Sequence, residues 1–87
     1  MANELHCEIL TMAGSLFSGP ARFVVARAVD GEVGVLPDHA PIVSALGEGA
    51  LRITGPDGAV ARFRASGGFL HVLRNRVTIL TSECVRI

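Results

Sequence analysis

The stretch LRITGPDGAVARFRA, at residues 51–65, decides the fold class of this chain. Before its centre Leu51 and Ile53 alternate with polar residues, and after its centre Phe63 alternates with arginines. A period of two places successive side chains on opposite faces of a β-strand. The segment GPDG at residues 55–58 separates the two runs, and its Asp-Gly pair readily adopts positive φ. Residues 51–65 therefore predict a β-hairpin.

The rest of the chain repeats this pattern. Leu5, Cys7 and Ile9 alternate with polar neighbours, and the runs 69–73 and 77–80 are apolar on both sides of Arg74-Asn75, which predicts a second hairpin. No window keeps a helical period of 3.6, and the prolines at 37 and 41 exclude a helix between them. Turn signals about 8–12 residues apart, separating nine or ten short strands, predict an all-β sandwich or barrel.

Length and composition limit the possible classes of function. A chain of 87 residues is expected to form one domain, residues 1–87. Its formal net charge of +0 argues against a nucleic-acid partner bound through phosphates. It contains neither a signal-peptide pattern nor the ~18-residue apolar run of a membrane span, so we expect a soluble intracellular domain without membrane insertion. A mean hydropathy of +0.47 predicts an exposed apolar face that another protein covers.

The sequence contains no pattern typical of catalysis or of a cofactor site. It lacks paired Cys-x-x-Cys, His-Glu-x-x-His and Gly-x-Ser-x-Gly motifs, and residues 47–49 are more typical of a turn than of a phosphate loop. Cys7 and Cys84 are expected to be reduced, buried thiols, with a disulfide or a shared metal site as the alternatives. A second hypothesis is a small metal- or ligand-binding β-barrel that uses four scattered side chains: His6, Cys7, His71 and Cys84. The main prediction is a protein with no catalytic residues and no cofactor.

The stretch GEVGVLPDHAPI, at residues 31–42, is the most distinctive. It predicts a loop, a short apolar strand and a stiff corner between two prolines. In the simplest interpretation of the corner, Asp38 or His39 forms a hydrogen bond with local backbone. Together with residues 17–19, 66–72 and 77–80, the stretch resembles the amino-terminal domain of the epsilon subunit of F-type ATP synthases. The order and spacing of these segments match that family from residue 4 to about residue 81.

The resemblance implies a flattened β-sandwich of about ten strands in a non-catalytic subunit of the central stalk. In that family the domain packs against the gamma subunit and rests on the ring of membrane c subunits, while the alpha and beta subunits carry the nucleotide chemistry. The resemblance places Gly31 and Glu32 at the c ring, and His39 with Ser44 at the gamma subunit. It also implies a peripheral position at the cytoplasmic face of a bacterial cell membrane.

The chain differs from typical members at its carboxyl end. They continue into a two-helix hairpin, whereas residues 81–87 are neither long enough nor patterned for one. We therefore expect this hairpin to be absent, in a naturally short or truncated chain. Inhibition and nucleotide binding by the hairpin are accordingly not expected.

Overall fold

Strands account for the regular structure of residues 4–87, the part of the chain that the computed structural model describes. Eight strands follow one another: β1 (Leu5–Thr11), β2 (Gly14–Ala21), β3 (Phe23–Ala28), β4 (Gly31–Val35), β5 (Ile42–Thr54), β6 (Val60–Leu73), β7 (Arg76–Leu80) and β8 (Cys84–Arg86). The all-β prediction is confirmed. Over the same residues the structure has no helix that is long and apolar enough to cross a membrane.

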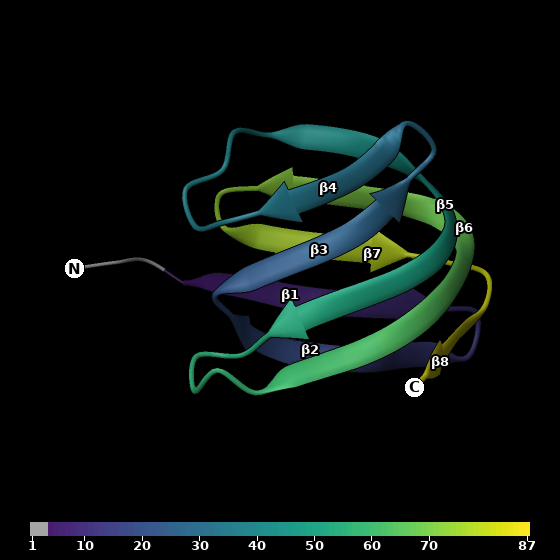
Figure 1. The fold of residues 1–87 in the computed structure, drawn as a ribbon, viewed down its shortest axis with the longest axis horizontal. Coiled ribbons are helices and arrows are strands. Elements are labelled where there is room, and N and C mark those ends of the chain that lie inside the picture. Colours follow the sequence, from purple (N-terminus) through teal and green to yellow (C-terminus); the bar gives the residue numbers. More distant parts are fainter. Residues whose placement is uncertain (1–3) are drawn as a thin grey trace.

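The strands form two layers, and the long strands β5 and β6 curve from one layer into the other (Figure 1). We call β3, β4 and β8, with the end of β5 and the start of β6, the front layer. The back layer contains β1, β2 and β7, with the start of β5 and the end of β6. Accordingly β8 pairs with residues 63–65 of β6, and β7 pairs with residues 69–73. All pairings are antiparallel except β1 with β7, which is parallel.

The number of strands differs from the expected ten because β5 and β6 remain continuous through the corner between the layers. Their register runs from the pair Ile42–Val72 to the pair Thr54–Val60. Gly68 of β6 lies at this corner with φ +118, a conformation that side chains rarely adopt. A Cβ atom there would overlap the Leu80 carbonyl, so the approach of β6 to the end of β7 requires glycine.

The core lies between the layers and follows the predicted alternation. Leu5, Cys7 and Ile9 of β1 are buried, and Phe63 of β6 is the largest fully buried side chain. The Phe17 ring packs edge-on against Phe63 with a centroid separation of 5.9 Å. The two apolar faces thus meet in one cluster: Leu5, Cys7, Ile9, Ala21, Val24, Ala26, Val35, Leu46, Leu51, Ile53, Phe63, Ala65, Leu70, Val72, Val77 and Ile79.

Both predicted hairpins are confirmed. Gly58, with φ +89, donates its N–H to the carbonyl of Gly55 at 3.0 Å in the β5–β6 turn. Arg74 and Asn75 join β6 to β7 with φ values of 50 and 64, which correspond to the turn type that matches strand twist. The Asn75 side chain also fixes the corner at residues 36–41, because Asp38 N–H donates to its Oδ1 at 2.6 Å and its Nδ2 donates to Asp38 Oδ1 at 3.1 Å.

Candidate partner-binding surface

A row of apolar side chains crosses the outer face of the back layer. Ala45 of β5 lies opposite Phe69 of β6, Phe69 lies opposite Leu80 of β7, and Leu80 lies opposite Leu10 of β1. These residues point outward because their neighbours in each strand point into the core. Phe69 is 56% exposed and Leu80 is 48% exposed. We call these four residues the apolar row.

The apolar row continues at both ends. Val43 of β5, next to it on the outer face, is 70% exposed, and Leu73 of β6 is also exposed. At the other end lies an open groove of about 360 Å³, which is lined by Leu10, Thr11, Met12, Gly68, Leu80, Thr81 and Ser82. Contiguous apolar surface of this kind marks a contact with another protein more often than a site of chemistry. The expectation of an exposed apolar face is therefore confirmed.

His39 and Ser44, the two residues predicted to face the gamma subunit, occupy different positions in the structure. His39 lies in the corner after β4, half-buried, with Nδ1 2.7 Å from the Ala40 carbonyl oxygen, which accepts its hydrogen bond. Ser44 is half-buried on the inner side of β5, opposite the buried Leu70. Its neighbours Val43 and Ala45 point outward instead, and the alternation within β5 is the signal that identifies them. Their assignment to a partner stays a prediction.

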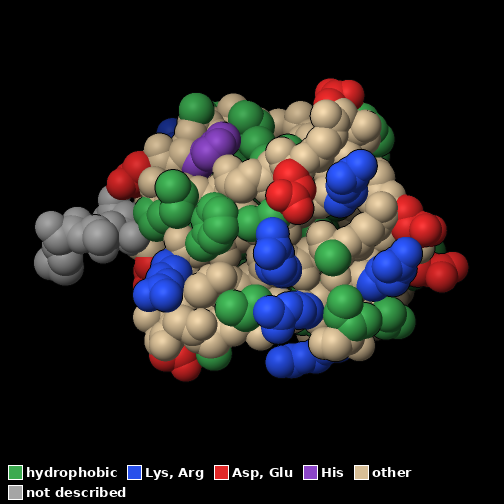
Figure 2. Space-filling view, viewed as in Figure 1, with side chains coloured by type: hydrophobic (Ala, Val, Ile, Leu, Met, Phe, Trp, Pro, Cys, Tyr) green, Lys and Arg blue, Asp and Glu red, His purple; other side chains and the backbone are tan. Residues whose placement is uncertain are grey.

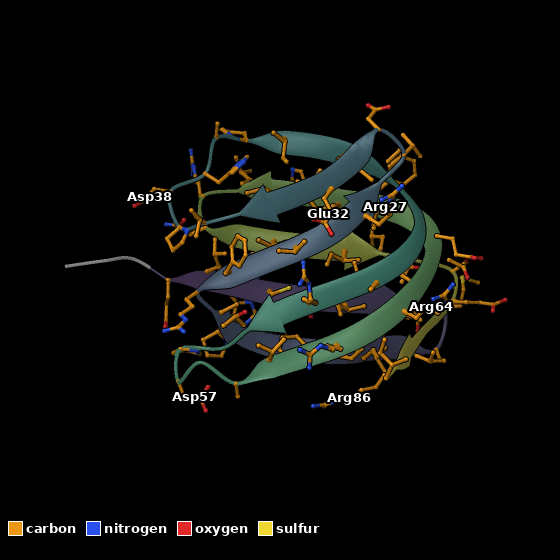
Figure 3. The ribbon with its side chains drawn as sticks, viewed as in Figure 1. Arg27, Glu32, Asp38, Asp57, Arg64 and Arg86 are labelled. Carbon is orange, nitrogen blue, oxygen red and sulfur yellow. The ribbon has the colours of Figure 1, made fainter. Side chains whose placement is uncertain are left out.

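The two residues predicted to face the c ring lie in β4, and here the expected loop is wrong. Gly31–Val35 is a strand paired with β3, and the turn falls at residues 29–30. Gly31 enters the strand with φ +133. The Glu32 side chain is 63% exposed (Figure 3), and its Oε2 lies 3.7 Å from an Arg52 guanidinium nitrogen, which makes a solvent-exposed ion pair. The exposed tip of the hairpin, Val29 and Asp30, is the part that sequence reasoning missed, although Asp-Gly is a turn signal.

The alternative of a metal site finds no support in residues 4–87, where no three His, Cys, Asp or Glu side chains gather. Cys7 points into the core, whereas His6 and His71 alternate with buried neighbours and point outward. Burial, followed by the nearby Glu8 charge, raises the pKa of the Cys7 thiol to about 12. Cys7 and Cys84 are free cysteines; Cys7 is buried as expected, whereas Cys84 is only half-buried, so its expected burial is wrong.

The comparisons with known proteins point in one direction. Residues 4–87 match the family described as "ATP synthase, Delta/Epsilon chain, beta-sandwich domain". The chain is 41% identical over 78 residues to an ATP synthase epsilon chain of Exiguobacterium sp., covering 90% of this chain and 57% of that protein. It is 42% identical over 80 residues to the epsilon chain of Micrococcus luteus, covering 92% of this chain and 88% of that protein. This chain thus spans less than two thirds of the first of these relatives.

Two solved structures have the same fold. The first is the mitochondrial ATP synthase of Euglena gracilis, in its OSCP/F1/c-ring assembly, with a TM-score of 0.90 and 28% identity over 95% of this chain and 53% of that one. The second is the central stalk/c-ring of the Tetrahymena thermophila enzyme, with a TM-score of 0.79 over 97% of this chain and 67% of that one. At 13% identity, the second similarity concerns the fold alone.

Proposed function

This chain belongs to the family of ATP synthase delta/epsilon chain β-sandwich domains, and from that premise we propose that it is a non-catalytic subunit of the central stalk of an F-type ATP synthase. In this role it couples rotation of the membrane c ring to the gamma shaft and has no active site of its own. The complex is bound to the membrane, and the chain lies at its cytoplasmic face in a bacterial cell, beneath the alpha and beta subunits.

The observation that carries the proposal is the apolar row. A coupling subunit needs stiffness and a broad contact rather than reactive groups. The two layers share β5 and β6, which makes them one unit, and Phe69 and Leu80 of the apolar row are half-exposed on the outer face of the back layer. Covering such side chains removes apolar surface from water, and this stabilises the complex by about 25 cal/mol per Å² of surface buried. We assign this face, with Val43 and the adjacent corner at His39, to the gamma subunit.

The β3–β4 hairpin is assigned to the c ring. Val29 and Asp30 form its exposed tip, and Glu32 follows Gly31 on the same strand. A carboxylate at the margin of a contact sets orientation and association rate more than affinity, because it keeps part of its hydration. The hairpin and the apolar row lie on different layers, which suits a wedge held between two partners.

Co-purification tests the gamma contact. The tagged chain is expressed with the gamma subunit encoded in the same genome, and the recovered gamma is quantified. Leu80→Glu is expected to reduce recovery at least about tenfold, because it places a charge in the centre of an apolar contact. Val85→Glu is the matched control, since Val85 is 60% exposed on β8 of the front layer. Equal loss with both variants, or no gamma with the unmodified chain, would refute the assignment.

A further inference from the structure

Four arginines gather on the outer face of the front layer, although the chain as a whole has a formal net charge of +0. This arginine face consists of Arg27 on β3, Arg52 on β5, and Arg62 and Arg64 on β6. Figure 2 shows arginine side chains grouped on the side turned toward the viewer, over these strands. Glu32 pairs with Arg52 at 3.7 Å and Glu48 pairs with Arg64 at 3.6 Å. Within residues 4–87 Arg27 and Arg62 have no ion pair, so the face has surplus positive charge.

Arg52 and Arg62 are directly opposite each other in the β5–β6 ladder. Both are outward residues, so their side chains leave the sheet on the same face. Like charges in this arrangement repel and destabilise the pair of strands. Glu32, which also lies opposite Arg27 in the β3–β4 ladder, pairs with Arg52 at a distance longer than the ~2.7–2.9 Å of a strong charge-assisted hydrogen bond, and it forms no ion pair with Arg62. One uncompensated guanidinium therefore remains at the centre of the arginine face.

A pocket of about 150 Å³ lies between these two arginines. The residues that line it are Phe23, Val25, Arg52, Thr54, Val60 and Arg62. Apart from the Thr54 hydroxyl, the two guanidinium groups are its only charged or polar side chains among the residues described. A planar guanidinium binds a carboxylate through two parallel N–H···O bonds, and apolar walls strengthen such bonds by lowering the local dielectric constant.

The size of the pocket discriminates between possible anions. Pockets for drug-sized ligands measure about 300–1,000 Å³, so this one is too small to enclose a nucleotide. It matches the end of an acidic side chain that enters from another protein, with its methylene groups against Phe23 and Val60. Arg27 and Arg64 lie two residues beyond Val25 and Arg62 on β3 and β6, both on the same side of the pocket, where they attract further acidic residues of the same segment.

We propose that the pocket between Arg52 and Arg62 binds a glutamate or aspartate side chain from an acidic segment of a partner protein. The bound carboxylate relieves the repulsion between the two arginines and competes with Glu32 for Arg52. This contact lies on the outer face of the front layer, away from the apolar row, and it goes beyond the proposed function. The result of a test of this contact therefore does not depend on whether the chain binds the gamma subunit.

The test is an NMR titration of the full chain with a hexaglutamate peptide. The side-chain Nε–Hε signals of Arg52 and Arg62 are expected to shift and saturate, while those of Arg76 on β7 stay in place. Arg62→Gln is expected to weaken binding of the peptide about tenfold. Arg62→Lys keeps the positive charge but lacks the two parallel N–H donors of a guanidinium, and it is expected to weaken binding less. The matched control Arg76→Gln removes the same charge from the back layer and is expected to change affinity less than about twofold.

Three outcomes would overturn the proposal. Equal weakening by Arg62→Gln and Arg76→Gln would mean that only net charge attracts the peptide. Inorganic phosphate that binds as tightly as hexaglutamate would make this a site for small anions. Tighter binding of an oligothymidine than of hexaglutamate would assign the arginine face to nucleic acid. The amide spectrum of each variant serves as the control for folding.

Discussion

Replacing Gly68 with alanine tests the corner that joins the two layers. Gly68 has φ +118, and an added Cβ would lie 2.9 Å from the carbonyl carbon of Leu80 and from Cα of Thr81. Backbone atoms cannot rotate away, so β7 must shift. Gly14 offers a matched control, because it has the same φ of +118 but nothing within 4 Å of the added atom.

The two substitutions separate strain from overlap. Both place a side chain in a disfavoured conformation, at a cost of about 1–3 kcal/mol. Only Gly68→Ala adds the overlap, which costs about 1–3 kcal/mol more, as other cases of overpacking do. The sum is a large part of the roughly 4–13 kcal/mol expected for a domain of this length at about 0.05–0.15 kcal/mol per residue.

Urea denaturation followed by circular dichroism measures the difference. Gly68→Ala is expected to lower the free energy of unfolding by at least about 1 kcal/mol more than Gly14→Ala, at an unchanged m value. Both substitutions replace glycine with alanine, so they lower the conformational entropy of the unfolded chain equally, and this contribution cancels in the difference. Equal losses within about 0.5 kcal/mol would refute the argument that the approach of β6 to β7 requires glycine.

Three other predictions concern single side chains. Asn75→Gly keeps the positive φ of its turn but removes two hydrogen bonds to Asp38, so thermal denaturation is expected to show a loss of about 1–2 kcal/mol. Because the pKa of the Cys7 thiol is raised, its contribution to the free energy of unfolding is fully present below pH 9 and decreases as the pH rises toward about 12. Thermal denaturation at pH 8 and at pH 10 should therefore show a lower stability at pH 10. Cys7→Ala should make this difference between the two pH values smaller. Glu32→Ala is expected to cost the free chain no more than about 0.5 kcal/mol, yet to lower the ratio of ATP-driven ion pumping to hydrolysis in the assembled enzyme, with Glu32→Lys lowering it further; equal ratios for all three proteins would contradict a role at the ring.

Local pattern was sufficient for most of the strands and turns. The alternation around Phe63 predicted which side chains are buried, because one face of each strand packs on the core. Arg74-Asn75 was correctly predicted as a turn from its position between two apolar runs. The same local pattern could not show that β5 and β6 remain continuous, because glycines such as Gly68 mark a bend as readily as a break. Which strands pair across long separations is decided by packing, and alternation carries no record of it.

The candidate sites were less accessible from sequence. A loop was expected at Gly31 and Glu32 because the glycines at 31 and 34 lie on either side of Glu32 and its neighbour. Pairing with β3 instead extends the strand through both residues. The opposition of Arg52 and Arg62 follows from the register of one hairpin and could have been predicted from its turn. The resemblance to a family supplied the expected partners, and no contact within this chain replaces that information.

Calorimetric titration of the chain with the gamma subunit encoded in the same genome measures the proposed contact itself. We expect a one-to-one complex with a negative change in heat capacity, because the apolar row leaves water on binding. Leu80→Glu should abolish the heat, and Val85→Glu should preserve it. Absence of binding by the folded chain, or binding with no change in heat capacity, would contradict the assignment of the apolar row to the gamma subunit.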